Sequence, residues 1–139
     1  MNWFAVSTGR FKTLITHCSV WNFDSMYGTT DEVWFDEWEH GDPPWGKNRE
    51  SYEKHSPQRK AANLGKFKTP MLLIQNDLDF RCPIGQGHEL FTTLQRLRVP
   101  SKMVNFPDEG HWVAKPKNGA FWHKEVFAWL EKYVEPGGK

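Results

Sequence analysis

Two loops of this sequence carry residues whose types and spacing suit acid–base chemistry. The first loop, residues 76–83, holds Asp77 and Asp79, and the second, residues 106–112, holds His111. A carboxylate beside an imidazole fixes the imidazole tautomer and stabilises its protonated form, so that the histidine can act as a general base. The sequence therefore predicts an Asp–His pair, with either aspartate as its acid.

The elements that must position these loops are the strands of a parallel sheet. Residues 71–75 (MLLIQ) form a continuous apolar run, which is typical of a buried central strand. Residues 101–106 alternate in polarity and predict a later strand, and residues 11–20 predict an earlier one. Apolar residues recur at helical spacing over residues 84–97 and 121–134. We therefore expect an α/β fold with parallel strands and flanking helices, whose loops meet at the carboxyl edge of the sheet.

The segment between the first two strands is irregular. Residues 28–57 are rich in tryptophan, acids, glycine and proline, which predicts short helices and loops. Within this segment, Asp31 is expected to cap a helix that continues through Trp38. At the other end of the chain, Gly137 and Gly138 predict a flexible terminus.

The composition excludes several classes of function. The chain has 139 residues, enough for one hydrophobic core, and a formal net charge of +1. It has no basic stripe interleaved with aromatics, so nucleic acid is not an expected partner. No apolar run reaches the roughly 18 residues that span a membrane. The first residues lack the basic region of a signal peptide, and the compartment stays open between cytoplasmic and secreted or periplasmic.

The cysteines and histidines show no disulfide or metal motif. Cys18 and Cys82 stand in different segments, without a CxxC pair. The histidines form no HxxxH or HExxH motif. We therefore expect neither a metal site nor a cofactor.

Several motifs taken together resemble the prolyl oligopeptidase family of serine peptidases, and within it the dipeptidyl-peptidase and acylaminoacyl-peptidase branch. The motifs are KTPMLLIQND, DLDFRCP, the helix start PIGQG, the block VPSKMVNFPDEGHW and the tail WHKEVFAWLEKYV. They succeed one another at the family's spacing over essentially the whole chain. The resemblance implies an α/β-hydrolase fold and a Ser–Asp–His peptidase that acts on short peptides.

The resemblance also assigns roles to individual residues. The family's acid falls on Asp79, which stands two positions before Arg81, and its base falls on His111. In related members, the residue at the position of Arg81 contacts the substrate's peptide carbonyl. The alternative for Arg81 is a salt bridge to Asp77 or Glu109.

Other residues of these segments receive weaker assignments. Trp34 lies in the Trp-rich insertion, which the family places near its substrate cleft, and it is a candidate substrate contact. A role in packing alone is the alternative for Trp34. We expect Asp108 and Glu109 to be loop acids without a chemical role.

The family's nucleophile has no counterpart in this sequence. That serine sits in a GxSYGGY-type elbow, whose strained turn exposes the hydroxyl, and the sequence contains no GxSxG. Residues 1–5 resemble the segment directly after the elbow in the family. We therefore expect residues 1–139 to form a partial α/β-hydrolase domain without the elbow and the upstream strands. The first strand would then have a bare edge, to be covered by the missing N-terminal part or by a homo-oligomer partner.

These observations leave three functions open. The chain is a segment of a serine exopeptidase whose serine comes from upstream sequence or another chain, or it is a non-catalytic remnant or interaction module. An esterase of the same fold is the third reading, because a fold does not determine its substrate.

Overall fold

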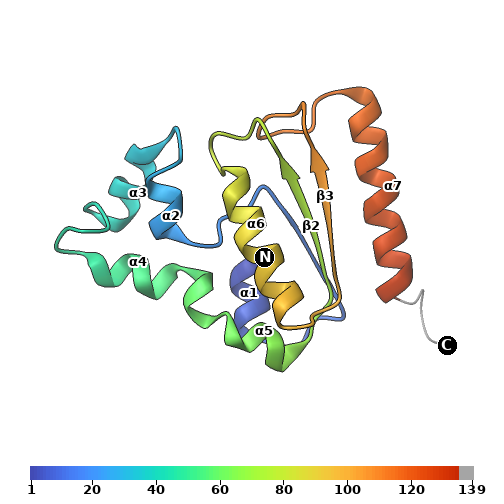
Figure 1. Cartoon of the computed structure of the whole chain (residues 1–139), viewed down its shortest axis with the longest axis horizontal. Helices are drawn as coiled ribbons and strands as arrows, with labels where there is room; N and C mark the ends of the chain where they lie inside the picture. The colour runs from blue at the N-terminus through green and yellow to red at the C-terminus, as the bar shows by residue number, and fades with distance from the viewer. Residues whose placement is uncertain (135–139) are drawn as a thin grey trace.

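A three-stranded parallel sheet with helices on both faces forms the centre of the molecule (Figure 1). The structure, a computed structural model, describes residues 1–134. The strands are β1 (Leu14–His17), β2 (Met71–Asn76) and β3 (Ser101–Phe106), in the spatial order β1-β2-β3. Both pairs of neighbours are parallel. The predicted α/β fold with parallel strands and flanking helices is confirmed, and Gly137 and Gly138 lie outside the described residues.

The helices are α1 (Asn2–Ser7), α2 (Phe23–Tyr27), α3 (Val33–His40), α4 (Arg49–His55), the 3₁₀ helix η1 (Pro57–Lys60), α5 (Ala62–Phe67), α6 (Ile84–Arg96) and α7 (Pro116–Tyr133). The two helices predicted from periodicity are confirmed as α6 and α7. α7 begins earlier than predicted because Pro116 fits a first helical turn, where its missing N–H costs nothing. No helix among residues 1–134 combines the length and the apolar character needed to cross a membrane.

β2 pairs with both other strands, and every one of its side chains is buried. On one face, Leu73 packs among apolar residues of α5 and α6, such as Leu64 and Leu90. On the other face, Leu72 packs against α7, where Trp129 is buried. A fully buried side chain of this size contributes about 1.5–3 kcal/mol. The continuous apolar run therefore serves two cores, one on each side of the sheet.

β1 is shorter than the predicted strand of residues 11–20. Cys18 still donates its N–H to the oxygen of Ile74 at 3.0 Å. Its φ of 43° lies in the left-handed region, however, which turns the backbone out of the extended strand conformation. The following loop therefore leaves the sheet at the carboxyl end of β1.

The beginning of α3 is tied to the loop that follows β2. The N–H of Asp31 donates to the oxygen of Phe80 at 2.8 Å, and the hydroxyl of Thr30 donates to the oxygen of Arg81 at 2.8 Å. Glu32 occupies the N-cap position, and no side chain caps the helix. The predicted N-cap role of Asp31 is therefore wrong, because the backbone of Asp31 is used in a contact between loops.

α3 also carries a buried acid that has little to stabilise its charge. Asp36 is 5% exposed, and its Oδ2 has no hydrogen-bond partner among residues 1–134. Burial, together with nearby Glu39, raises the pKa of Asp36 to about 6. The unfolded chain loses this proton near the ordinary value of 3.8, whereas the folded chain keeps it until about 6. Folding stability therefore falls as the pH rises between these two values.

We predict that Asp36→Asn stabilises the chain at neutral pH and not in acid. The amide carries no charge to bury, so the free energy of unfolding should rise by up to about 2 kcal/mol near pH 8 and change little near pH 4. Urea unfolding at both pH values measures the difference. Asp31→Asn, at an exposed acid nearby, is the matched control. An equal loss of stability at both pH values would contradict the prediction.

Candidate active site

Asp79 and His111 meet at the carboxyl edge of the sheet. Nδ1 of His111 lies 3.0 Å from Oδ2 of Asp79 and 3.2 Å from Oδ1. The side chain of Asp79 is fully buried, whereas that of His111 is 23% exposed. The structure thus brings together the two residues to which the family resemblance assigned the acid and the base.

The carboxylate of Asp79 is held by backbone donors from its own loop. Oδ1 accepts the N–H of Arg81 at 3.1 Å and the N–H of Cys82 at 2.9 Å. A buried charged group is costly unless hydrogen-bond donors replace water around it. These donors and the imidazole N–H together satisfy the carboxylate, and they orient it toward His111.

The loop that carries His111 is organised by a second buried acid. The carboxylate of Glu109 accepts hydrogen bonds from the N–H of Ala114 at 3.1 Å, the N–H of Lys115 at 3.0 Å and the amide of Asn118 at 2.7 Å. Burial raises the pKa of Glu109, but these hydrogen bonds outweigh it and hold the pKa below its usual value. Glu109 was predicted to have no chemical role, and here it shapes the loop between β3 and α7.

Two hydrogen bonds join the Asp79 loop to the His111 loop. The amide of Asn76 donates to the oxygen of Gly110 at 2.6 Å, and the N–H of Leu78 donates to the oxygen of Glu109 at 3.0 Å. Asn76 is fully buried at the end of β2. These bonds set the separation of the two loops, and therefore the distance between the acid and the histidine.

Two buried glutamines, which the sequence reasoning missed, brace the site from β2 and α6. Gln75 donates to the oxygen of Cys82 at 2.9 Å, and Gln86 accepts the N–H of Trp21 at 2.9 Å. A side chain at Gly87 would place its Cβ 3.0 Å from the side chain of Gln75, so any other residue there would displace Gln75. The sequence offered one indication of this role, which was the polar residue Gln75 at the end of an otherwise apolar strand.

Arg81 has a different ion-pair partner from those predicted. Its Nε lies 2.9 Å from Oε2 of Glu32 at the beginning of α3. Asp77 instead accepts a hydrogen bond from Asn105 at 2.8 Å, and Glu109 is engaged within its own loop. The predicted salt bridge of Arg81 to Asp77 or Glu109 is therefore wrong. The side chain of Arg81 remains 43% exposed beside the Asp–His pair.

Trp34 lies on the surface of α3. It is 59% exposed, and its ring stacks on Phe35 with 4.0 Å between centroids. Trp38 and Trp45, in the same insertion, are 84% and 77% exposed. The insertion therefore presents aromatic rings to solvent, and a substrate contact by Trp34 stays a prediction.

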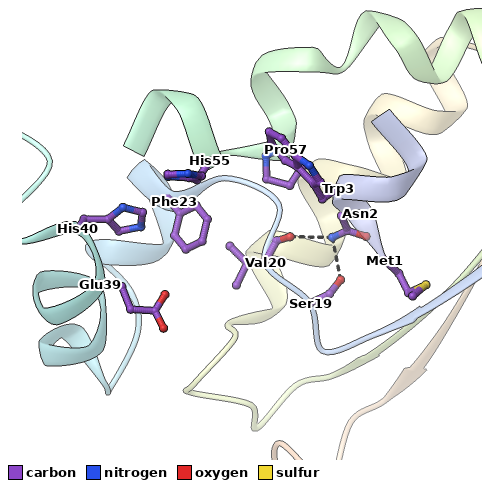
Figure 2. Close-up of a pocket in the computed structure, with 10 residues that line it drawn as sticks. All are labelled: Met1, Asn2, Trp3, Ser19, Val20, Phe23, Glu39, His40, His55 and Pro57. Atoms are coloured by element: carbon purple, nitrogen blue, oxygen red, sulfur yellow. Dashed lines mark hydrogen bonds between the residues drawn. The ribbon is translucent and has the colours of Figure 1, made fainter. Parts of the chain in front are cut away.

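A pocket of about 540 Å³ opens beside the loop that follows β1. Figure 2 shows that its lining comes from α1, this loop, α2 and the insertion. The amide of Asn2 donates to the hydroxyl of Ser19 at 2.8 Å and to the oxygen of Val20 at 2.7 Å, which fixes the loop against α1. Neither Asp79 nor His111 lines the pocket.

The geometry suits general-base chemistry at Nε2 of His111. Because Nδ1 faces the carboxylate of Asp79, it carries the proton in the neutral ring, and Nε2 keeps a lone pair. Among residues 1–134, the imidazole forms hydrogen bonds only with Asp79. Nε2 is therefore free to accept a proton from a nucleophile.

Comparisons with known proteins found relatives that match nearly the whole chain. The chain matches the prolyl oligopeptidase family over residues 1–137. It is 43% identical to dipeptidyl-peptidase 5 of Aspergillus oryzae over 135 residues, covering 96% of this chain and 18% of that protein. It is 36% identical to dipeptidyl-peptidase 5 of Porphyromonas gingivalis over 129 residues, covering 91% of this chain and 18% of that protein.

The fold is that of α/β-hydrolase peptidases. The acylaminoacyl peptidase of Pyrococcus horikoshii superposes with a TM-score of 0.86 at 26% identity, covering 99% of this chain and 22% of that chain. This chain therefore spans less than a quarter of the length of the relatives it matches.

We predict that Asp79 determines the tautomer of His111. In the unaltered chain, the neutral ring should carry its proton on Nδ1, whereas Asp79→Asn should populate the Nε2-protonated form because the carboxylate acceptor is gone. Long-range ¹⁵N–¹H NMR of the imidazole distinguishes the two tautomers. Asp77→Asn is the matched control and should leave the spectrum of His111 unchanged. An Asp79→Asn spectrum identical to that of the unaltered chain would exclude this role.

Proposed function

Because this chain belongs to the prolyl oligopeptidase family, we propose that it is the C-terminal part of the catalytic domain of a serine exopeptidase that acts on short peptides. The observation that carries the proposal is the 3.0 Å contact between buried Asp79 and Nδ1 of His111. This pair is the acid and base half of a Ser–Asp–His triad.

In the proposed reaction, Asp79 holds the Nδ1–H of His111 so that Nε2 faces the nucleophile. Nε2 takes the proton of a serine hydroxyl as the oxygen attacks the peptide carbonyl. The protonated imidazole, stabilised by Asp79, then gives this proton to the leaving amine. Water hydrolyses the acyl-enzyme in a second round, with His111 again acting as the base.

The nucleophile in this proposal belongs to upstream sequence or to another chain. The serine elbow motif is missing from residues 1–139, and no serine among residues 1–134 forms a hydrogen bond with His111. Ser19, in the loop after β1, is engaged with Asn2 and Thr16. We therefore regard residues 1–139 as a partial α/β-hydrolase domain without the elbow and the upstream strands.

The edge of β1 is the proposed place of attachment for the rest of the domain. β1 pairs with β2 on one side, and no strand among residues 1–134 pairs with its other edge. An unpaired strand edge offers backbone donors and acceptors to a further strand. We assign this edge to the missing N-terminal part of the protein, or to a second copy of the chain.

The peptide is proposed to bind at the rim of the Asp–His pair. The half-exposed guanidinium of Arg81 can donate to a substrate carbonyl, and exposed Trp34 offers an aromatic contact. The pocket beside Val20 has the size and mixed lining suited to a substrate side chain. Arg81 is tethered to Glu32, so that the insertion and the acid loop would act on the substrate as one surface.

A chimaera tests the proposal directly. This chain replaces the matching segment of dipeptidyl-peptidase 5 of Aspergillus oryzae, and release of a chromophore from a dipeptide substrate is measured. We predict that the chimaera is active and that His111→Ala or Asp79→Asn lowers kcat by about 10³-fold or more. Asp77→Asn is the matched control and should retain activity. A folded but inactive chimaera, or activity independent of His111, would favour the non-catalytic remnant.

The position of the nucleophile has a separate control. The isolated chain is incubated with a fluorophosphonate probe, and its intact mass is read before and after. We expect no adduct, because no serine among residues 1–134 forms a hydrogen bond with His111. An adduct would place a nucleophile within this chain, and peptide mapping would identify it.

The chimaera also tests whether Arg81 contacts the substrate. Arg81→Ala should raise KM about 10- to 100-fold with a smaller effect on kcat, because a hydrogen bond from a charged donor to the substrate is lost. Glu32→Gln is the matched control, since it removes the ion pair and leaves the guanidinium. If Glu32→Gln raises KM as much as Arg81→Ala does, Arg81 serves to hold the loop and does not contact the substrate.

A further inference from the structure

A cysteine lies beside the Asp–His pair. The sulfur of Cys18, a carboxylate oxygen of Asp79 and a ring nitrogen of His111 all lie within 4.8 Å of one another. Cys18 follows β1, Asp79 is in the loop after β2, and His111 is in the loop after β3. The three parallel strands therefore deliver a thiol, a carboxylate and an imidazole to one point. We call Cys18, Asp79 and His111 the three-residue cluster.

The packing around Cys18 fixes its thiol in this position. Just past the end of β1, the N–H of Cys18 donates to the backbone oxygen of Ile74 in β2. Cys18 is 7% exposed. Its sulfur therefore stays beside the carboxylate of Asp79 and the ring of His111.

A thiolate, an imidazole and a carboxylate form a ligand set that zinc uses in proteins. Zinc bonds of about 2.0–2.3 Å in a tetrahedron place neighbouring ligand atoms roughly 3.3–3.8 Å apart. The cluster reaches this spacing with small side-chain shifts, because its atoms are at most 4.8 Å apart. The partly exposed side of His111 leaves a path for an ion to enter.

We propose that the three-residue cluster binds one thiophilic divalent cation, Zn²⁺ or Cd²⁺, with water at the fourth position. In the binding step, the thiol proton of Cys18 leaves to solvent as the sulfur–metal bond forms. The proton on Nδ1 of His111 moves to Nε2, so that Nδ1 coordinates the ion. One oxygen of Asp79 supplies the third bond and neutralises charge.

A neighbouring histidine adds a second observation at the same place. His17, the last residue of β1, directly precedes Cys18. Its Nε2 is buried and has no hydrogen-bond partner among residues 1–134.

A bound ion would prevent His111 from acting as the general base. Nε2 carries the ring proton in the metal-bound state, so it no longer accepts a proton from a nucleophile. This consequence rests on the proposed peptidase function, whereas binding of the ion does not. The site is therefore a candidate for reversible inhibition by metal, and a chelator would restore the free pair.

The test is a titration of the reduced, folded chain with Cd²⁺, followed by ultraviolet sulfur-to-cadmium absorption and by calorimetry. We expect one ion per chain, displaced by Zn²⁺. Cys18→Ser should abolish the absorption, and His111→Gln should weaken binding about tenfold or more while retaining the sulfur signal. Cys82→Ser, at the other buried cysteine, is the matched control and should bind as the unaltered chain does.

Several results would contradict the proposed metal site. The first is the absence of the sulfur-to-cadmium absorption band, or a band that persists in Cys18→Ser or disappears in Cys82→Ser. The second is an affinity for Cd²⁺ that His111→Gln leaves unchanged. If Cys18→Ser does not fold, the ¹¹³Cd and ¹⁵N NMR spectra of the unaltered chain decide. The proposal requires one sulfur ligand and direct coordination by Nδ1 of His111.

Different results would contradict the proposed metal site and the proposed peptidase function. In an active chimaera, Zn²⁺ should inhibit, a chelator should reverse the inhibition, and Cys18→Ser should resist it. Cd²⁺ binding to the chain without inhibition of an active, His111-dependent chimaera would count against inhibition by the ion and leave the proposed peptidase function standing. Loss of binding with the chimaera still active would count against the metal site alone.

Discussion

The burial of one carboxylate is the constraint on which the rest of this site depends. Asp79 is almost entirely removed from water, and leaving such a charge without partners would cost several kcal/mol. The backbone N–H groups of Arg81 and Cys82 and the ring of His111 replace the lost water. The backbone of the loop must therefore fold back around the side chain of Asp79. Gln75 stabilises this conformation by donating to the backbone oxygen of Cys82.

The parallel sheet turns this local requirement into a site. Asn76 and Phe106 are paired in register at the ends of β2 and β3, so the acid loop and the histidine loop start side by side. Buried side chains then link the loops, with Asn76 bound to Gly110 and Glu109 holding the return to α7. Apolar packing on both faces of β2 supports these polar contacts, because a rigid strand is needed to hold a hydrogen bond near 3 Å.

The same convergence places Cys18 beside the Asp–His pair. β1, β2 and β3 all end at one edge, so any residue that follows them competes for the same small volume. A base and a metal ligand both require Nδ1 of His111, the first as a proton donor to Asp79 and the second as a lone pair. The two proposed uses of the ring are therefore mutually exclusive, so that an ion in the proposed site would exclude the proposed base.

The sequence by itself determined the fold and the pair of loops. Apolar periodicity and the order of acid and histidine are local properties of the chain, and the family motifs distinguished Asp79 from Asp77, which pattern alone did not. Only the tertiary structure decided that Arg81 pairs with Glu32 and that Cys18 joins the acid and the histidine. These contacts connect segments far apart in the chain, and they depend on strand register and loop path. Periodicity carries no information about either, because it reports which face of an element is buried and not what lies opposite it.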